Sequence, residues 1–87
     1  MDTEVIADRV TQLLIQRLGL PPETVHATAR LADDLGMDSV DSVEFALALE
    51  REFQTPIPDE VLTDVKTVED VIGTVRVLMN RYGVATA

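Results

Sequence analysis

Apolar residues recur at helical spacing in three segments of this chain, and no segment alternates apolar and polar residues as a half-buried strand does. The first segment covers residues 2–18 and ends before Gly19 and a Pro-Pro pair. The second covers residues 39–53. The third opens with Thr-Val-Glu-Asp at 67–70, which is typical of a capped helix start. With a short helix over residues 59–64, this pattern predicts an all-α fold. We expect a small four-helix bundle with a short third helix.

A long loop over residues 19–38 joins the first two predicted helices. Loops of this length in small domains are functional or disordered. Val25, Leu31 and Leu35 are spaced along it and are expected to hold it against the core. At 87 residues, the chain is expected to form a single domain over residues 1–87.

The composition excludes several function classes. The chain has no cysteine, so it offers no disulfide and no thiol chemistry of its own. No apolar run reaches the roughly 18 residues of a membrane span, and no signal peptide is visible, so we expect a cytoplasmic protein without membrane insertion. A net charge of −9 argues against nucleic-acid binding. Nine of the sixteen acidic residues lie between residues 33 and 60, where Arg51 is the only base. This concentration of acids favours basic protein partners.

The predicted helix over residues 39–53 has two apolar stripes. Phe45, Leu49 and Phe53 follow i, i+4, i+8 spacing and form a core stripe. A second stripe lies more than a quarter turn away and is flanked by acids. The residues of the second stripe are Val40, Val43 and Leu47. A docking surface and a wide core face both explain this second stripe, and periodicity does not decide between them.

An Asp-Ser-Val tripeptide occurs twice, so Ser39 and Ser42 share a local context. Ser39 lies at the predicted helix start, where a serine often caps the helix. Neither serine is expected to be a catalytic nucleophile, because the only histidine, His26, lies in the long loop and activation requires a nearby base. Helix geometry alone does not separate the two serines.

The acidic residues also invite a test for calcium binding. Asp33 and Glu44 are separated as the first and twelfth residues of an EF-hand loop. The sixth position, which requires glycine, is Asp38, so the pattern fails. We therefore expect no metal site and no catalytic site.

The run DDLGMDSVDSVEFALALEREFQTPIPDE at residues 33–60 closely resembles the acyl carrier proteins. Their signature is Asp-Leu-Gly-x-Asp-Ser-Leu, then an acidic helix ending in Glu-Phe, then Ile-Pro-Asp. The resemblance extends over nearly the whole chain. It implies that a phosphopantetheinyl transferase attaches 4′-phosphopantetheine from coenzyme A to Ser39. The arm supplies the thiol that the chain lacks, and acyl intermediates travel on it as thioesters. The chain would then be a carrier in fatty acid or related lipid biosynthesis and not an enzyme.

The resemblance also implies two sets of further residues. Acyl-loading, condensing and acyl-transfer enzymes with basic patches would dock on a monomeric carrier through the helix that follows Ser39. The implied docking residues are Asp38, Val40, Asp41, Glu44, Leu47 and Glu50. The implied acyl pocket is apolar and consists of Leu31, Phe45, Leu49, Ile57, Leu62 and Val65.

Three residues depart from the family pattern. Val40 replaces the usual Leu, Leu31 stands where fatty acid carriers commonly have Phe, and Arg51 stands where they usually have Glu. These departures leave a polyketide or aminoacyl pathway as an alternative. An alternative from another class is an acidic helical interaction module without a prosthetic group.

Overall fold

The computed structural model describes residues 2–82, which contain three α-helices, two 3-10 helices and no strand. The α-helices are α1 (Thr3–Leu18), α2 (Ser39–Phe53) and α3 (Val68–Tyr82). The 3-10 helices are η1 (Pro22–Thr24) and η2 (Asp59–Asp64). The expected all-α fold is confirmed. The short helix expected at 59–64 has the expected bounds but is a 3-10 helix. A segment of six residues after Pro58 is in the length range in which the tighter 3-10 form is common.

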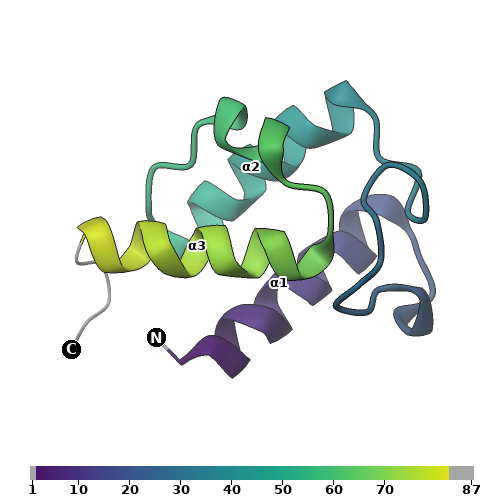
Figure 1. Cartoon of the computed structure of the whole chain (residues 1–87), viewed down its shortest axis with the longest axis horizontal. Helices are drawn as coiled ribbons and strands as arrows, with labels where there is room; N and C mark the ends of the chain where they lie inside the picture. Colours follow the sequence, from purple (N-terminus) through teal and green to yellow (C-terminus); the bar gives the residue numbers. More distant parts are fainter. Residues whose placement is uncertain (1, 83–87) are drawn as a thin grey trace.

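The three α-helices are connected by a long loop and a shorter one, and α1 packs against both α2 and α3. In Figure 1 the loop between α1 and α2 lies at the end of the molecule where α2 and α3 begin. η2 packs against α2. The starts of two helices and the long loop therefore come together at one end of the fold.

Local signals explain where the helices begin and end. Gly19 adopts the left-handed conformation with φ of 65°, and its N–H donates to the Ile15 carbonyl at 2.9 Å, which closes α1. At the start of α3, the Asp70 N–H donates to Thr67 Oγ1 at 3.3 Å and the Thr67 N–H donates to Asp70 Oδ2 at 3.1 Å. This reciprocal pair is the predicted capping box. The sequence also predicts that the third helix stops at Gly83, which lies outside the described residues.

The core is mainly aliphatic, with two phenylalanines, and includes residues from the long loop as well as from all three α-helices. The three expected loop anchors, Val25, Leu31 and Leu35, are buried, as is Ala29. The loop is also tied to the start of α3 through a bridge between Arg30 and Thr67 and through backbone hydrogen bonds. Buried residues of the α-helices form most of the rest of the core. These are Ile6, Val10, Leu14, Phe45, Ala46, Leu49, Phe53, Val68, Val71, Val75 and Met79.

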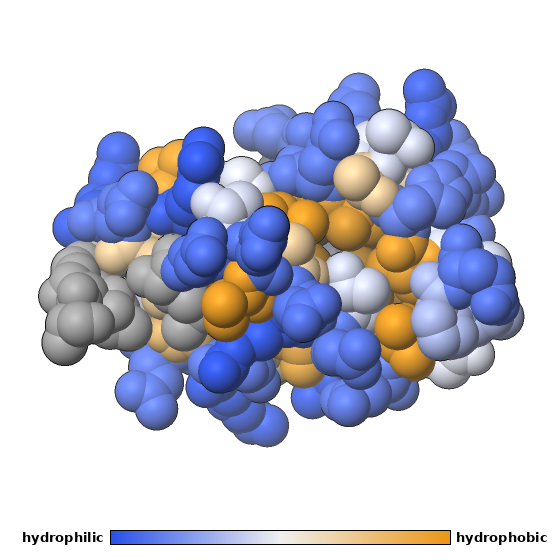
Figure 2. Space-filling view, turned by 90° about the horizontal axis from the view of Figure 1, so that it is seen from below, coloured by the Kyte–Doolittle hydropathy of each residue, from blue (hydrophilic) through white to orange (hydrophobic). Residues whose placement is uncertain are grey.

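The outer surface is predominantly polar. Figure 2 shows hydrophilic residues over most of the face seen from below, with hydrophobic residues lying between them near its middle. None of the described helices combines the length and the apolar character that crossing a membrane requires.

Candidate functional site

The backbone turn before α2 explains the Asp-Leu-Gly-Met-Asp-Ser sequence. Leu35 and Met37 are both buried and hold the end of the loop against the core. Between them Gly36 has φ of 71°, a left-handed conformation that favours glycine. The Met37 N–H donates to the Leu31 carbonyl at 2.9 Å, so the loop folds back on itself before α2 starts. These features fix the point at which the chain enters the helix.

Asp38 and Asp41 together cap the start of α2. The Asp41 N–H donates to Asp38 Oδ1 at 2.8 Å, and the Asp38 N–H donates to Asp41 Oδ2 at 3.2 Å. Ser39 is therefore the first residue of the helix and not its cap, so the capping alternative for Ser39 is wrong. Asp38 adopts the extended backbone conformation of a cap residue, and the preceding turn puts it there.

The structure separates the two serines. The Ser42 side chain is half-buried, and its hydroxyl donates to the Asp38 carbonyl at 3.1 Å. Ser39 is exposed, and among the described residues its hydroxyl has no hydrogen bond. An incoming enzyme therefore has direct access to the Ser39 hydroxyl, whereas the Ser42 hydroxyl is already engaged with the backbone.

The surroundings of Ser39 suit an attached phosphate. Within residues 2–82, the Ser39 and Val40 N–H groups have no acceptor, as is usual for the first N–H groups of a helix. The dipole of a helix of 15 residues favours negative charge at this end. The Asp38 and Asp41 carboxylates oppose an anion here, but each already accepts a backbone N–H. A phosphodiester at Ser39 would have two free N–H donors beside it.

The second apolar stripe of α2 is exposed and does not form a core face. Val40 is 63% exposed, Val43 43% and Leu47 49%. The core stripe on the opposite side, formed by Phe45 and Leu49, is almost completely buried. The structure thus excludes a wide core face as the explanation of the second stripe, and the exposed stripe stays available for docking.

The expected docking acids on α2 differ in how their carboxylates are used. Asp38 and Asp41 form the cap, and Glu50 Oε2 accepts the Ile57 N–H at 3.2 Å, which holds the chain after α2. Glu44 is exposed and, in the part of the chain that the structure describes, makes no side-chain hydrogen bond or ion pair. Among these acids, Glu44 is the one whose carboxylate has only a surface role.

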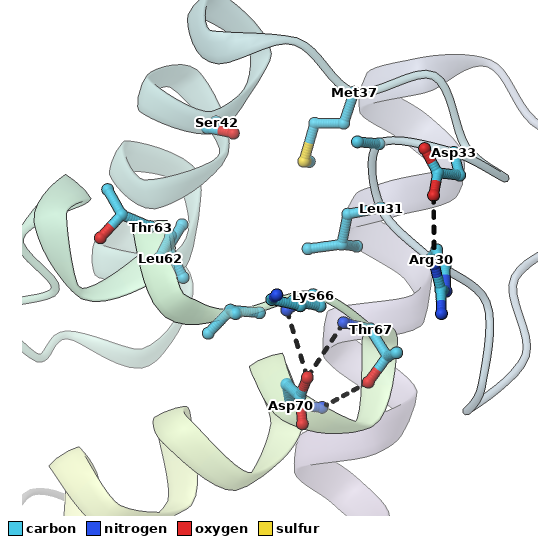
Figure 3. A pocket seen from close by; sticks show the side chains of 12 residues that line it. Arg30, Leu31, Asp33, Met37, Ser42, Leu62, Thr63, Lys66, Thr67 and Asp70 are labelled. Atoms are coloured by element: carbon cyan, nitrogen blue, oxygen red, sulfur yellow. Dashed lines mark hydrogen bonds and ion pairs between the residues drawn. The ribbon is translucent and has the colours of Figure 1, made fainter.

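A pocket of about 620 Å³ opens beside α2, between the long loop and the segment that contains η2. Figure 3 shows Leu31 and Met37 pointing into this space from the loop, and the Ser42 hydroxyl facing it from α2. Three of the six residues expected in an acyl pocket line it. These are Leu31, Leu62 and Val65. The other three, Phe45, Leu49 and Ile57, lie in the core at 0–1% exposure and do not line this pocket.

The pocket is also lined by polar residues that the sequence analysis did not assign to a pocket. They come from separate segments that only the fold brings together. These residues are Arg30, Asp33, Ser42, Thr63, Lys66, Thr67 and Asp70. The Lys66 and Thr67 N–H groups donate to the Asp70 carboxylate and hold its pKa below the usual value, so this wall of the pocket carries a fixed negative charge at neutral pH. The sequence singled out Ser42 for its repeated tripeptide, Asp33 for its spacing from Glu44, and Thr67 and Asp70 for their capping pattern, but it placed none of them in a pocket.

Comparison with known proteins gives a consistent result at three levels. Residues 8–75 match the family model described as phosphopantetheine attachment site. The chain is 46% identical over 66 residues to an acyl carrier protein of Bdellovibrio bacteriovorus, covering 76% of this chain and 85% of the relative. It also resembles the solution structure of the apo doublet acyl carrier protein from prodigiosin biosynthesis, with a TM-score of 0.70 and 28% identity. That match covers 84% of this chain and 35% of the doublet chain.

Proposed function

This chain belongs to the acyl carrier proteins, and we propose that Ser39 is the residue to which its 4′-phosphopantetheine arm is attached. The observation that carries the proposal is the contrast between the two serines. Ser39 presents an exposed hydroxyl at the first residue of α2, whereas the Ser42 hydroxyl is half-buried and bonded to the Asp38 carbonyl. The arm ends in a thiol, which carries acyl groups as thioesters and supplies chemistry that a chain without cysteine lacks.

The residues around Ser39 contribute position and charge. The Gly36 turn and the Asp38–Asp41 cap hold the helix start, so the Ser39 hydroxyl stands at a fixed point on the surface. The unpaired N–H groups of Ser39 and Val40 are suited to donate hydrogen bonds to the phosphodiester oxygens. The loop histidine, His26, is exposed and contacts Thr28 Oγ1 at 3.2 Å, and among the described residues it makes no hydrogen bond to Ser39. The partner enzyme would supply the base.

The exposed stripe of α2 is the proposed docking surface for partner enzymes. Phosphopantetheinyl transferase and acyl-loading, condensing and acyl-transfer enzymes are the expected partners, since proteins of this family are carriers. Val40 and Leu47 would fill small apolar pockets on the partner, and Glu44 would face its basic residues. The chain itself would act as a substrate for these enzymes and would catalyse no step.

Fatty acid or related lipid biosynthesis is the proposed pathway. The alternative is a polyketide or aminoacyl pathway. The structural likeness to a carrier from prodigiosin biosynthesis supports this alternative. The match to the phosphopantetheine attachment family favours either of these over an interaction module without a prosthetic group. We further propose that residues 1–87 act as one monomeric carrier domain in the cytoplasm, with η2 as the third member of a four-helix bundle.

The test of the attachment site is intact mass after incubation with coenzyme A, magnesium and a broad-specificity transferase. One phosphopantetheine should be added to the wild-type chain and to Ser42→Ala, and none to Ser39→Ala. The circular dichroism of both variants shows whether the helices are retained. A mass increase in folded Ser39→Ala would contradict the assignment.

A further inference from the structure

The pocket beside α2 begins next to the proposed attachment site. Ser42 lines the pocket and lies one helical turn after Ser39. Residues three apart on a helix have Cβ atoms about 5–6 Å apart, so both serines lie on one side of α2. An arm attached to Ser39 therefore starts at the edge of the pocket, and its acyl end can fold back into it.

The pocket has an apolar part and a polar part. Leu31, Met37, Leu62 and Val65 form the apolar part. Charged and hydroxyl side chains form the rest, and in Figure 3 Lys66 lies between Leu62 and Thr67 along one side. A saturated chain would cover these polar groups without bonding to them, which is unfavourable.

Several of the polar groups retain hydrogen-bonding capacity. Ser42 Oγ donates to the Asp38 carbonyl and keeps its lone pairs. Thr67 Oγ1 accepts from the Asp70 N–H and keeps its proton. Within residues 2–82 the Lys66 ammonium has no hydrogen bond or ion pair. These groups can form hydrogen bonds with an oxygen that enters the pocket. They can donate to a carbonyl oxygen, and they can both donate to and accept from a hydroxyl.

The charges around the pocket nearly cancel. Arg30 pairs with Asp33 at 3.3 Å, and the Asp70 carboxylate, fixed in the cap of α3, lies on the same side as Lys66. The pocket therefore lacks the excess positive charge that a carboxylate would require, and it suits a neutral oxygen. The pocket does not continue into the core, where Phe45, Leu49 and Ile57 are packed at 0–1% exposure, so a long saturated chain finds no open space there.

We infer that this pocket receives a short acyl chain with a neutral oxygen near the thioester, as in a β-oxo or β-hydroxy acyl group, in preference to a saturated chain. Lys66 donates to that oxygen, Ser42 accepts from it when it is a hydroxyl, and Leu31, Met37 and Leu62 cover the carbon atoms. This inference rests on the proposed function, since the chain must be carried on Ser39.

The test compares three amide-linked acyl arms of equal length: hexanoyl, 3-oxohexanoyl and 3-hydroxyhexanoyl. Intact mass first establishes loading at Ser39, and an unloaded protein would contradict the proposed function itself. The melting temperature and the backbone amide chemical shifts of each loaded form then report on the pocket. Both oxygenated arms should shift the amides of Leu31, Met37 and Lys66. They should also melt above the hexanoyl form, by about 4–8 °C for one retained hydrogen bond.

Variants assign the effect to the named groups. The double variant Lys66→Met with Ser42→Ala should remove the advantage of the oxygenated arms, and Lys66→Arg should retain it. Arg76→Met is the matched control, because Arg76 is an exposed cation on α3 outside this pocket. Higher stability of the hexanoyl form, unchanged pocket amides, or an undiminished advantage in the double variant would each overturn the inference.

Discussion

At the scale of single residues, neighbouring side chains with the same chemistry take different roles because the backbone fixes their surroundings. The Gly36 turn makes Asp38 the cap of α2 and leaves Ser39 as the first helical residue with its hydroxyl exposed. Ser42, three residues later, is turned towards the Asp38 carbonyl and the pocket. A repeated tripeptide thus yields one accessible hydroxyl and one engaged hydroxyl.

Asp70 provides a residue-scale prediction on pH. The N–H groups of Lys66 and Thr67 hold its pKa below the usual aspartate value of about 4, so its folded pKa is depressed relative to the unfolded chain. Such a group stabilises the fold above its unfolded pKa, and the contribution is lost as pH falls through the folded pKa. We expect Asp70→Asn to be less stable than wild type at pH 7, with a gap that narrows below about pH 4.

Urea unfolding at pH 7, 5, 4 and 3 measures this gap. Glu69→Gln is the matched control, because Glu69 is the adjacent exposed acid, also in the first turn of α3, and its side chain makes no hydrogen bond among the described residues. Its free energy of unfolding should follow the wild-type curve. A gap for Asp70→Asn that stays constant over the whole pH range would show that its charge does not support the helix start.

At the scale of elements, the acids of α2 divide into structural and surface groups, which predicts different outcomes for two substitutions. Glu50→Ala removes the acceptor of the Ile57 N–H and should cost about 1–2 kcal/mol of stability. Glu44→Ala should change the free energy of unfolding by less than about 0.5 kcal/mol, since the Glu44 side chain is exposed and makes no hydrogen bond among the described residues.

Glu44→Lys should nevertheless slow phosphopantetheine and acyl transfer by partner enzymes, because charges at the rim of an interface act mainly on the association rate. Urea unfolding measures the stability of the two alanine variants, and transfer rates at low salt test Glu44→Lys. Equal transfer rates for wild type and Glu44→Lys would exclude Glu44 from the proposed docking surface.

Helix bounds were predictable from the sequence because local residues set them, whereas the pocket was not. Gly19 ends α1 and the Thr67–Asp70 pair starts α3, and each makes its contacts within one turn of that helix. The pocket is lined by Ser42 and by some of the residues in segments 30–37 and 62–70, which tertiary packing alone brings together. Sequence resemblance supplied Ser39 as the candidate site, but the choice of Asp38 as cap depends on the buried anchors Leu35 and Met37. The 3-10 form of η2 and the presence of η1 were likewise not predictable, because neither has a periodic pattern in the sequence.

At the scale of the whole molecule, a net charge of −9 is carried by a body whose longest extent is 35 Å. The Debye length falls from about 30 Å at 0.01 M salt to about 8 Å at 0.15 M. At low salt the acids therefore repel one another across most of the length of the molecule. Arg51 is the only base between residues 33 and 60. Among the described acids of this range, only Asp33 and Glu52 form ion pairs, with Arg30 and Arg9, so the repulsion is concentrated around α2. Salt should consequently act on stability and on partner recognition in opposite directions.

We expect the melting temperature to rise between 0.01 M and 0.15 M sodium chloride, because screening reduces self-repulsion in the compact state. The rate of phosphopantetheine transfer to Ser39, the proposed attachment site, should fall over the same range, because screening weakens attraction to a basic partner. Arg51→Glu takes the net charge from −9 to −11 and should make the thermal dependence steeper, whereas Glu44→Gln takes it to −8 and should make it shallower. Thermal unfolding and mass-based transfer rates at matched salt concentrations measure both slopes. Stability that is independent of salt in wild type and in Arg51→Glu would mean that the acids of α2 impose no net repulsion, and the charge would then act on recognition alone.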